Sequence, residues 1–145
     1  MIFIIVFSVL LLDQSTKILA SKNILLGQTI PVISNIFHLT LVHNKGAAFG
    51  IFKNQTALFI LTSLTAIFII SYKLKARSAA GRLDILVVSL GLILAGTLGN
   101  LIDRLFLGYV VDFFDFRIWP VFNIADSAIT VGAILLGWTI LFNKK

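Results

Sequence analysis

Two carboxylates, Asp112 and Asp126, are the residues whose type and setting most suggest chemistry. They stand in one stretch, Gly108–Ser127, which reads GYVVDFFDFRIWPVFNIADS, and the second begins an apolar run that continues to Asn143. Carboxylates at the edge of lipid are costly to keep and usually serve a function. Two close carboxylates cannot both ionise cheaply, so they share a proton and can act as general acid and general base. This chemistry suits the attack of water on a peptide bond.

Two neighbours of this pair leave alternatives open. Asp115 follows Asp112 by three residues and would share its face if the stretch formed a helical turn, so spacing alone does not choose between them. Asn123 precedes the apolar run with Asp126 three residues on, which is close to a capping box. A helix N-terminus also favours the anionic form of Asp126. A capping role and a role as general base are therefore compatible.

The composition indicates a single integral-membrane domain over residues 1–145. Hydrophobic residues make up 59% of the chain and charged residues only 12%, whereas a soluble domain carries about 25% charged residues. So few charges could not cover a surface that faces water. The net charge of +6 invites a nucleic-acid reading, but the Lys and Arg residues form no stripe interleaved with aromatic residues. We therefore expect no nucleic-acid partner.

Cysteine and histidine usage limits the possible chemistry. The chain has no cysteine, which excludes thiol nucleophiles, disulfides and cysteine-ligated metals. His38 and His43 are too few for a histidine-rich metal cage, and the HExxH motif of metalloproteases is absent. We expect no metal and no cofactor.

Four apolar segments are long enough to cross a membrane as helices. The first is interrupted by Asp13 and Lys17, which are four residues apart in the favourable acid-before-base order, so we expect a pair that faces the helix bundle. The predicted transmembrane helices cover residues ~2–20, ~55–72, ~85–103 and ~125–142.

The longest non-spanning segment, 21–54, carries a strand signal. Within FHLTLV, residues 37, 39 and 41 point one way and residues 38, 40 and 42 the other. Gly46–Gly50 is rich in small residues and is expected to form a tight loop where backbone approaches something closely. The predicted fold class is thus an all-α membrane protein, with four transmembrane helices and a small extracytoplasmic β-containing cradle formed by 21–54 and 104–124.

Basic residues predict the orientation. The 73–82 loop contains Lys73, Lys75, Arg77 and Arg82, and the chain ends in two lysines. Positive residues in short loops mark the cytoplasmic side. Both regions are therefore placed inside, and an even number of spans places the N-terminus inside as well.

This topology brings polar residues from separate parts of the chain to one depth near the extracytoplasmic face. Such convergence of independent elements is typical of an active site. Asp103 lies near the C-terminal end of the third helix, where we expect it to form a structural polar cluster with Arg104. The converging residues are Asp13, Lys17, Asn44, Asn100, Asp103, Arg104, Asp112 and Asp126.

The residues alone allow other functions. A proton-coupled transporter also keeps charges in the membrane, but it would distribute them along a path, whereas the middle of the second and third helices is free of charge. A non-enzymatic anchoring subunit would tolerate Asp→Asn changes at Asp112 and Asp126.

Five ordered motifs resemble the lipoprotein signal peptidases, the signal peptidase II family of bacteria, over nearly the whole chain. Ala95 stands where that family often has a second glycine, a departure that concerns packing. The motifs are DQSTK at 13–17, NKGAAFG at 44–50, GTLGNLIDR at 96–104, VDF at 111–113 and FNIADS at 122–127.

The resemblance implies that Asp112 and Asp126 are the catalytic aspartates, which settles the choice against Asp115. It implies a monomeric enzyme of the bacterial inner membrane, in contact with membrane lipid, that cuts prolipoproteins before a cysteine already carrying a diacylglyceryl group. The positions it assigns to substrate binding or support are Asp13, Lys17, Asn44, Gly46, Asn100, Asp103, Arg104 and Asn123.

Overall fold

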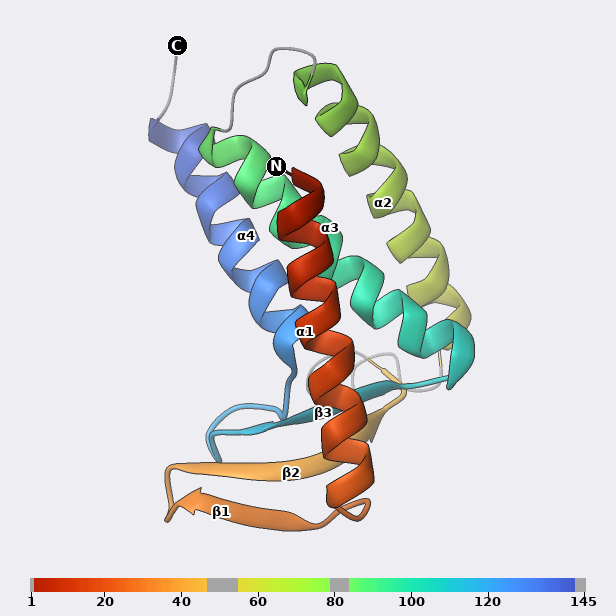
Figure 1. Ribbon diagram of the computed structural model, residues 1–145, viewed down its shortest axis with the longest axis vertical. Coiled ribbons are helices and arrows are strands. Elements are labelled where there is room, and N and C mark those ends of the chain that lie inside the picture. The colour runs from red at the N-terminus through yellow and green to blue at the C-terminus, as the bar shows by residue number, and fades with distance from the viewer. Residues whose placement is uncertain (1, 47–54, 79–83, 143–145) are drawn as a thin grey trace.

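Four long helices and one small sheet make up the protein (Figure 1). The computed structural model describes residues 2–46, 55–78 and 84–142. The helices are α1 (Ile2–Asn23), α2 (Thr56–Ser78), α3 (Ile85–Phe106) and α4 (Ile124–Phe142). Each is long and apolar enough to cross a membrane. The predicted fold class, four spanning helices with a small β structure, is confirmed.

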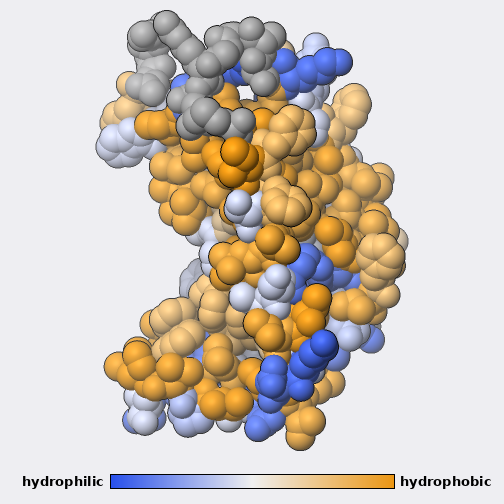
Figure 2. Space-filling view, viewed as in Figure 1, coloured by the Kyte–Doolittle hydropathy of each residue, from blue (hydrophilic) through white to orange (hydrophobic). Residues whose placement is uncertain are grey.

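The helices alternate in direction. The start of α1, the end of α2, the start of α3 and the end of α4 lie at one end of the bundle, and the sheet lies at the other (Figure 1). Figure 2 shows a mostly apolar surface over the helices, with hydrophilic residues at both ends and a smaller hydrophilic patch between them. This distribution is typical of a protein that crosses a membrane.

Helix α3 is the centre of the bundle, because it packs against α1, α2 and α4. Its N-cap is Asp84, whose side chain accepts a hydrogen bond from the backbone N–H of Val87 at 2.8 Å. A Cβ added at Gly96 would collide with the carbonyl oxygen of Ala125 in α4. Glycine at this position therefore allows α3 and α4 to approach closely beside the N-terminus of α4.

Strands β1 (Thr29–Ile33), β2 (Phe37–Asn44) and β3 (Val110–Asp115) form an antiparallel sheet in the order β1-β2-β3. The end of α1 packs on this sheet. The small core between them consists of Ala20, Ile24, Leu41, Val111 and Phe113. This core fixes β3 against the helix bundle and so determines where Asp112 lies.

Several predicted boundaries differ from the structure. The strand predicted from the alternation at 37–42 is confirmed and continues to Asn44. The basic segment from Lys73 is predicted as a loop, but α2 continues through it to Ser78. Lysine and arginine are good helix formers, so the helix can extend beyond the apolar run into the polar region of the membrane surface. The helical turn considered around Asp112 is wrong, because Val110–Asp115 is a strand. Of the predicted 46–50 loop, only Gly46 lies within the described residues.

Candidate active site

Asp112 is held in β3 with only 1% of its surface exposed. Asn44, at the end of the neighbouring strand β2, donates a hydrogen bond from Nδ2 to Asp112 Oδ2 at 2.9 Å. Asn123 donates from Nδ2 to Asp112 Oδ1 at 2.7 Å. Both carboxylate oxygens thus have a fixed amide donor, which sets the orientation of the carboxyl group.

Asp126 lies in the first turn of α4. Its Oδ1 accepts a hydrogen bond from Asn100 Nδ2 at 2.8 Å, and its Oδ2 accepts one from the backbone N–H of Asn123 at 3.3 Å. The backbone N–H of Asp126 in turn donates to Asn123 Oδ1 at 2.9 Å. This reciprocal pair is a capping box, as predicted from the spacing, in which aspartate replaces the usual longer acid.

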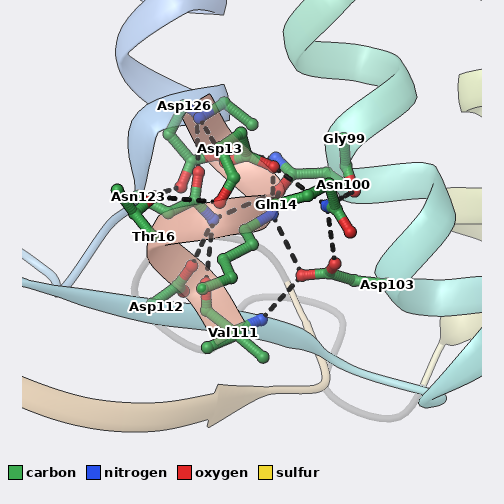
Figure 3. Close-up of polar contacts among 12 residues, drawn as sticks. Asp13, Gln14, Thr16, Gly99, Asn100, Asp103, Val111, Asp112, Asn123 and Asp126 are labelled. Carbon is green, nitrogen blue, oxygen red and sulfur yellow. Dashed lines mark hydrogen bonds and ion pairs between the residues drawn. The ribbon is translucent and has the colours of Figure 1, made fainter. Parts of the chain in front are cut away.

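The side chain of Asn123 connects the two aspartates (Figure 3). It is fully buried, and its amide nitrogen faces Asp112 while its amide oxygen receives the backbone N–H of Asp126. The same nitrogen also contacts Val111 O and Asn100 Oδ1, each at 3.2 Å. One planar amide therefore fixes the position of Asp112 in β3 relative to the N-terminus of α4.

A buried ionic cluster of Asp13, Lys17 and Asp103 lies beside the aspartates. Lys17 Nζ contacts Asp13 Oδ2 at 2.9 Å, Asp103 Oδ2 at 3.0 Å and Asn100 Oδ1 at 3.0 Å. The predicted Asp13–Lys17 pair is confirmed. Gln14, which the sequence interpretation left out of the site residues, donates to both Asp13 and Asp103 at 3.1 Å. A polar residue next to Asp13 on an apolar helix is the signal that could have found it.

Each carboxylate of the cluster also accepts a backbone N–H adjacent to a candidate catalytic aspartate. Asp13 Oδ1 accepts from the N–H of Ala125 at 2.8 Å, and Asp103 Oδ2 accepts from the N–H of Val111 at 3.0 Å. The cluster thus anchors the backbone immediately before Asp126 and immediately before Asp112. The cluster therefore positions the start of α4 and strand β3 relative to each other.

The predicted pairing of Asp103 with Arg104 is wrong. Asp103 forms its salt bridge with Lys17 instead. Among the described residues, Arg104 forms no salt bridge. Arg104 is instead stacked over the Phe59 ring, with its guanidinium carbon 5.0 Å from the ring centroid. Consecutive helical residues point about 100° apart, so Asp103 faces α1 while Arg104 faces α2.

Asp115 belongs to a different polar group. Its Oδ2 accepts hydrogen bonds from Thr40 Oγ1 at 2.7 Å and Arg117 Nη1 at 3.0 Å, and its Oδ1 accepts from the Arg117 N–H at 2.8 Å. Burial acts to raise the pKa of Asp115, but the bonds from Thr40 and Arg117 outweigh it and leave the pKa below its usual value. Residues three apart in a strand point to opposite faces, so Asp115 does not share the surroundings of Asp112.

A cavity of about 520 Å³ adjoins the two aspartates. Asp112, Asp126, Asn44, Asn100 and Arg104 line one part of it with polar groups. The segment at 119–122 and apolar residues of α2 and α4 line much of the rest, together with hydroxyl residues of α2, α3 and α4. The two surfaces together suit a ligand with a polar backbone and an apolar body. Gly46 also lines the cavity, and its N–H donates to Asn44 Oδ1 at 2.9 Å.

The electrostatics distinguish Asp112 from an ordinary surface carboxylate. Burial and the nearby Asp126 raise the pKa of Asp112 to about 7, although Asn44 and Asn123 partly offset the shift by donating to its charged form. A group with such a pKa holds a proton near neutral pH and can release it, as a general acid must. No cluster of three potential metal ligands occurs within the parts of the chain described here.

Fold and site together define a class of protein, a four-helix membrane protein with two carboxylates in a buried polar network beside a cavity. The family model described as signal peptidase II matches residues 5–142. The chain belongs to the signal peptidase II family.

Similar proteins support this membership over nearly the full length. The lipoprotein signal peptidase of Halothermothrix orenii is 48% identical, covering 94% of this chain and 92% of its own. That of Moorella thermoacetica is 50% identical, covering 92% and 87%. A solved structure described as a bacterial membrane enzyme has a TM-score of 0.90 at 34% identity, covering 99% of this chain and 91% of that chain.

Proposed function

We propose that the protein is an aspartic endopeptidase that removes signal peptides from prolipoproteins, with Asp112 and Asp126 as its catalytic pair. The observation that carries the proposal is the single buried amide of Asn123, which holds both aspartates beside one cavity. The relatives named lipoprotein signal peptidases supply the substrate class.

In this proposal the two aspartates have different roles, one as general acid and the other as general base. Asp112, with its pKa near 7, carries the shared proton. Asp126 accepts two hydrogen bonds at a helix N-terminus, which stabilise negative charge there, so it takes the proton of the attacking water. Asp112 protonates the carbonyl oxygen as the tetrahedral intermediate forms. When the intermediate collapses, the peptide C–N bond breaks and the amine leaves with a proton from the pair.

The surroundings suit a lipidated peptide. Asn44, Asn100 and Arg104 can hydrogen-bond peptide or ester oxygens, while the apolar part of the cavity accepts hydrocarbon. In this proposal the scissile bond precedes a cysteine that bears a diacylglyceryl group. The acyl chains stay in lipid and the peptide reaches the aspartates from the sheet side.

The proposal is tested by cleavage of a diacylglyceryl-modified lipobox peptide by the purified protein. Asp112→Asn and Asp126→Asn should each lower kcat by about 10²-fold or more, because each removes a proton-transfer group. Asp115→Asn is the matched control, three residues away in the same strand, and should keep most of the activity. Full activity in either of the first two variants would refute the catalytic pair. Equal cleavage of an unlipidated peptide would refute the lipid requirement.

We further propose that the protein acts as a monomer in the bacterial inner membrane, with both termini cytoplasmic and the sheet outside. The absence of cysteine allows a direct test by single-cysteine labelling. A membrane-impermeant maleimide should label Leu26→Cys, at the exposed turn before the sheet, in intact cells. It should label Lys73→Cys, at the opposite end of the bundle, only after the membrane is permeabilised. The reverse pattern would invert the orientation.

A further inference from the structure

A second cavity, of about 640 Å³, lies away from the aspartates, between α1, α2 and α3. Phe3 and Val6 of α1, Leu74 of α2, and Leu94 and Leu98 of α3 provide its apolar walls. The volume falls in the range of about 300–1,000 Å³ that is typical of small-ligand sites. We call this cavity the α1–α2 groove.

The groove exists because α1 and α2 both pack on α3 but not closely on each other. In Figure 1, α2 stands apart from α1 at the end of the bundle opposite the sheet. Phe3, on its wall, is 84% exposed. The groove therefore opens sideways to the membrane rather than to water.

Two polar groups lie on one rim of this otherwise apolar groove. Ser71 and Lys75 are one turn apart in α2, so their side chains share a face. Within the described structure no carboxylate pairs with Lys75. In the part of the chain that the structure describes, the acidic side chain at this end is that of Asp84, which is already bound to Arg77 and to the backbone N–H of Val87.

The depth of the groove corresponds to one leaflet of a membrane. Leu74, next to Lys75, packs in one cluster with Val87 and Leu90 of α3. Leu98 lies 8–11 residues beyond these two residues, which is roughly 12–17 Å along the helix at 1.5 Å per residue. Half of a hydrocarbon core is about 15 Å thick. A chain that begins at the level of Lys75 and ends near Leu98 therefore spans about one leaflet.

We propose that the α1–α2 groove binds one anionic glycerophospholipid, with its phosphate at Lys75 and Ser71 and an acyl chain between α1 and α2. Among the described residues Lys75 has no carboxylate partner, so its charge favours an anionic headgroup. The apolar walls accept the chain. The site is separate from the catalytic cavity, so this proposal stands independently of the proposed function.

The test is lipid retention by the purified, intact protein. The protein in detergent is incubated with equal amounts of phosphatidylglycerol and phosphatidylcholine with identical acyl chains, and native mass spectrometry counts the lipids that remain bound. The wild type should retain one phosphatidylglycerol in preference to phosphatidylcholine. Lys75→Gln should reduce that preference about fivefold, the effect of one lysine at an anionic lipid surface.

Two further variants sharpen the test. Lys73→Gln removes another exposed lysine of α2 that does not line the groove, and should leave the preference unchanged. Val6→Trp fills the groove and should reduce retention of both lipids, with thermal unfolding measured to verify folding. Equal retention of the two lipids by the wild type would overturn the proposal, as would equal effects of Lys75→Gln and Lys73→Gln. A lipid-free dimer in place of the lipid-bound monomer would assign the groove to a second copy instead.

Discussion

Replacement of Asn123 by alanine removes a side chain that bonds both aspartates, the carboxylate of Asp112 and the backbone N–H of Asp126. It deletes the donor to Asp112 Oδ1 and the acceptor of the Asp126 backbone N–H. The side chain is fully buried, so water does not readily replace it. Loss of an N-cap costs about 1 kcal/mol, and a buried partner left unsatisfied costs about 1–3 kcal/mol. We expect Asn123→Ala to destabilise the fold by about 2–4 kcal/mol.

The effect on catalysis should have a defined sign. In the wild type, kcat/KM should fall as pH rises through about 7, because Asp112 then loses the proton that it donates. Asn123 hydrogen-bonds the charged form of Asp112 and so lowers its pKa. Without Asn123 the pKa of Asp112 rises further. The alkaline limb of the pH profile should therefore move to higher pH. The value of kcat should fall by about 10²-fold, because the two carboxyl groups are no longer held in a fixed relative orientation.

The assay is kcat/KM for a lipidated lipobox peptide across pH 5–9, with thermal unfolding measured in the same detergent. Asn44→Ala is the matched variant, because it removes the other amide donor to Asp112 without removing the helix cap. It should move the alkaline limb in the same direction with a smaller loss of stability. An alkaline limb that moves to lower pH in either variant would refute the assignment of Asp112 as the proton carrier.

Two other predictions follow from burial and packing. Burial and the nearby Asp126 hold the folded-state pKa of Asp112 at about 7, above the ordinary value of 3.8. The folded state therefore binds this proton more tightly than the unfolded chain, and stability falls as pH rises from about 4 to about 7. Asp112→Asn should therefore raise Tm most at pH 7 and above, and a variant with the pH dependence of the wild type would contradict this. Gly99→Ala would place a Cβ 2.5 Å from Asp13 Oδ2 and should cost about 1–3 kcal/mol and most of the activity. Gly137→Ala, where a Cβ meets nothing within 4 Å, should be neutral or stabilising on thermal unfolding, and equal losses in both would refute the packing argument.

The helices and the capping box could be predicted because their signals are local. Continuous apolar runs indicate the four spans, and the spacing of Asn123 and Asp126 indicates the cap. The Asp13–Lys17 pair is local as well, since both residues lie on one face of one helix. In each case the interaction depends on residues within a turn or two of each other.

The wrong predictions concern partners from distant elements. Arg104 was the nearest cation to Asp103 in sequence, but Lys17 reaches Asp103 from α1. β3 is a strand because it pairs with β2, whose residues lie far earlier in the chain. The strand conformation also puts Asp115 and Asp112, three residues apart, on opposite faces, which the sequence alone did not indicate because it left the conformation of this stretch open. The α1–α2 groove likewise arises from how helices pack and has no local signal.

The contact between Asp13 and the N–H of Ala125 has a consequence for how the chain is made. The two residues are 112 positions apart, so α1 is synthesised and inserted long before its partner in α4 exists. Until then, a lone carboxylate in lipid would be costly. Lys17, one turn along the same helix, lets α1 enter the membrane with its own counter-ion. When α3 and α4 follow, Asp103 and the N–H of Ala125 find this ion pair already in place, so the polar network beside Asp112 and Asp126 can form in the order of synthesis.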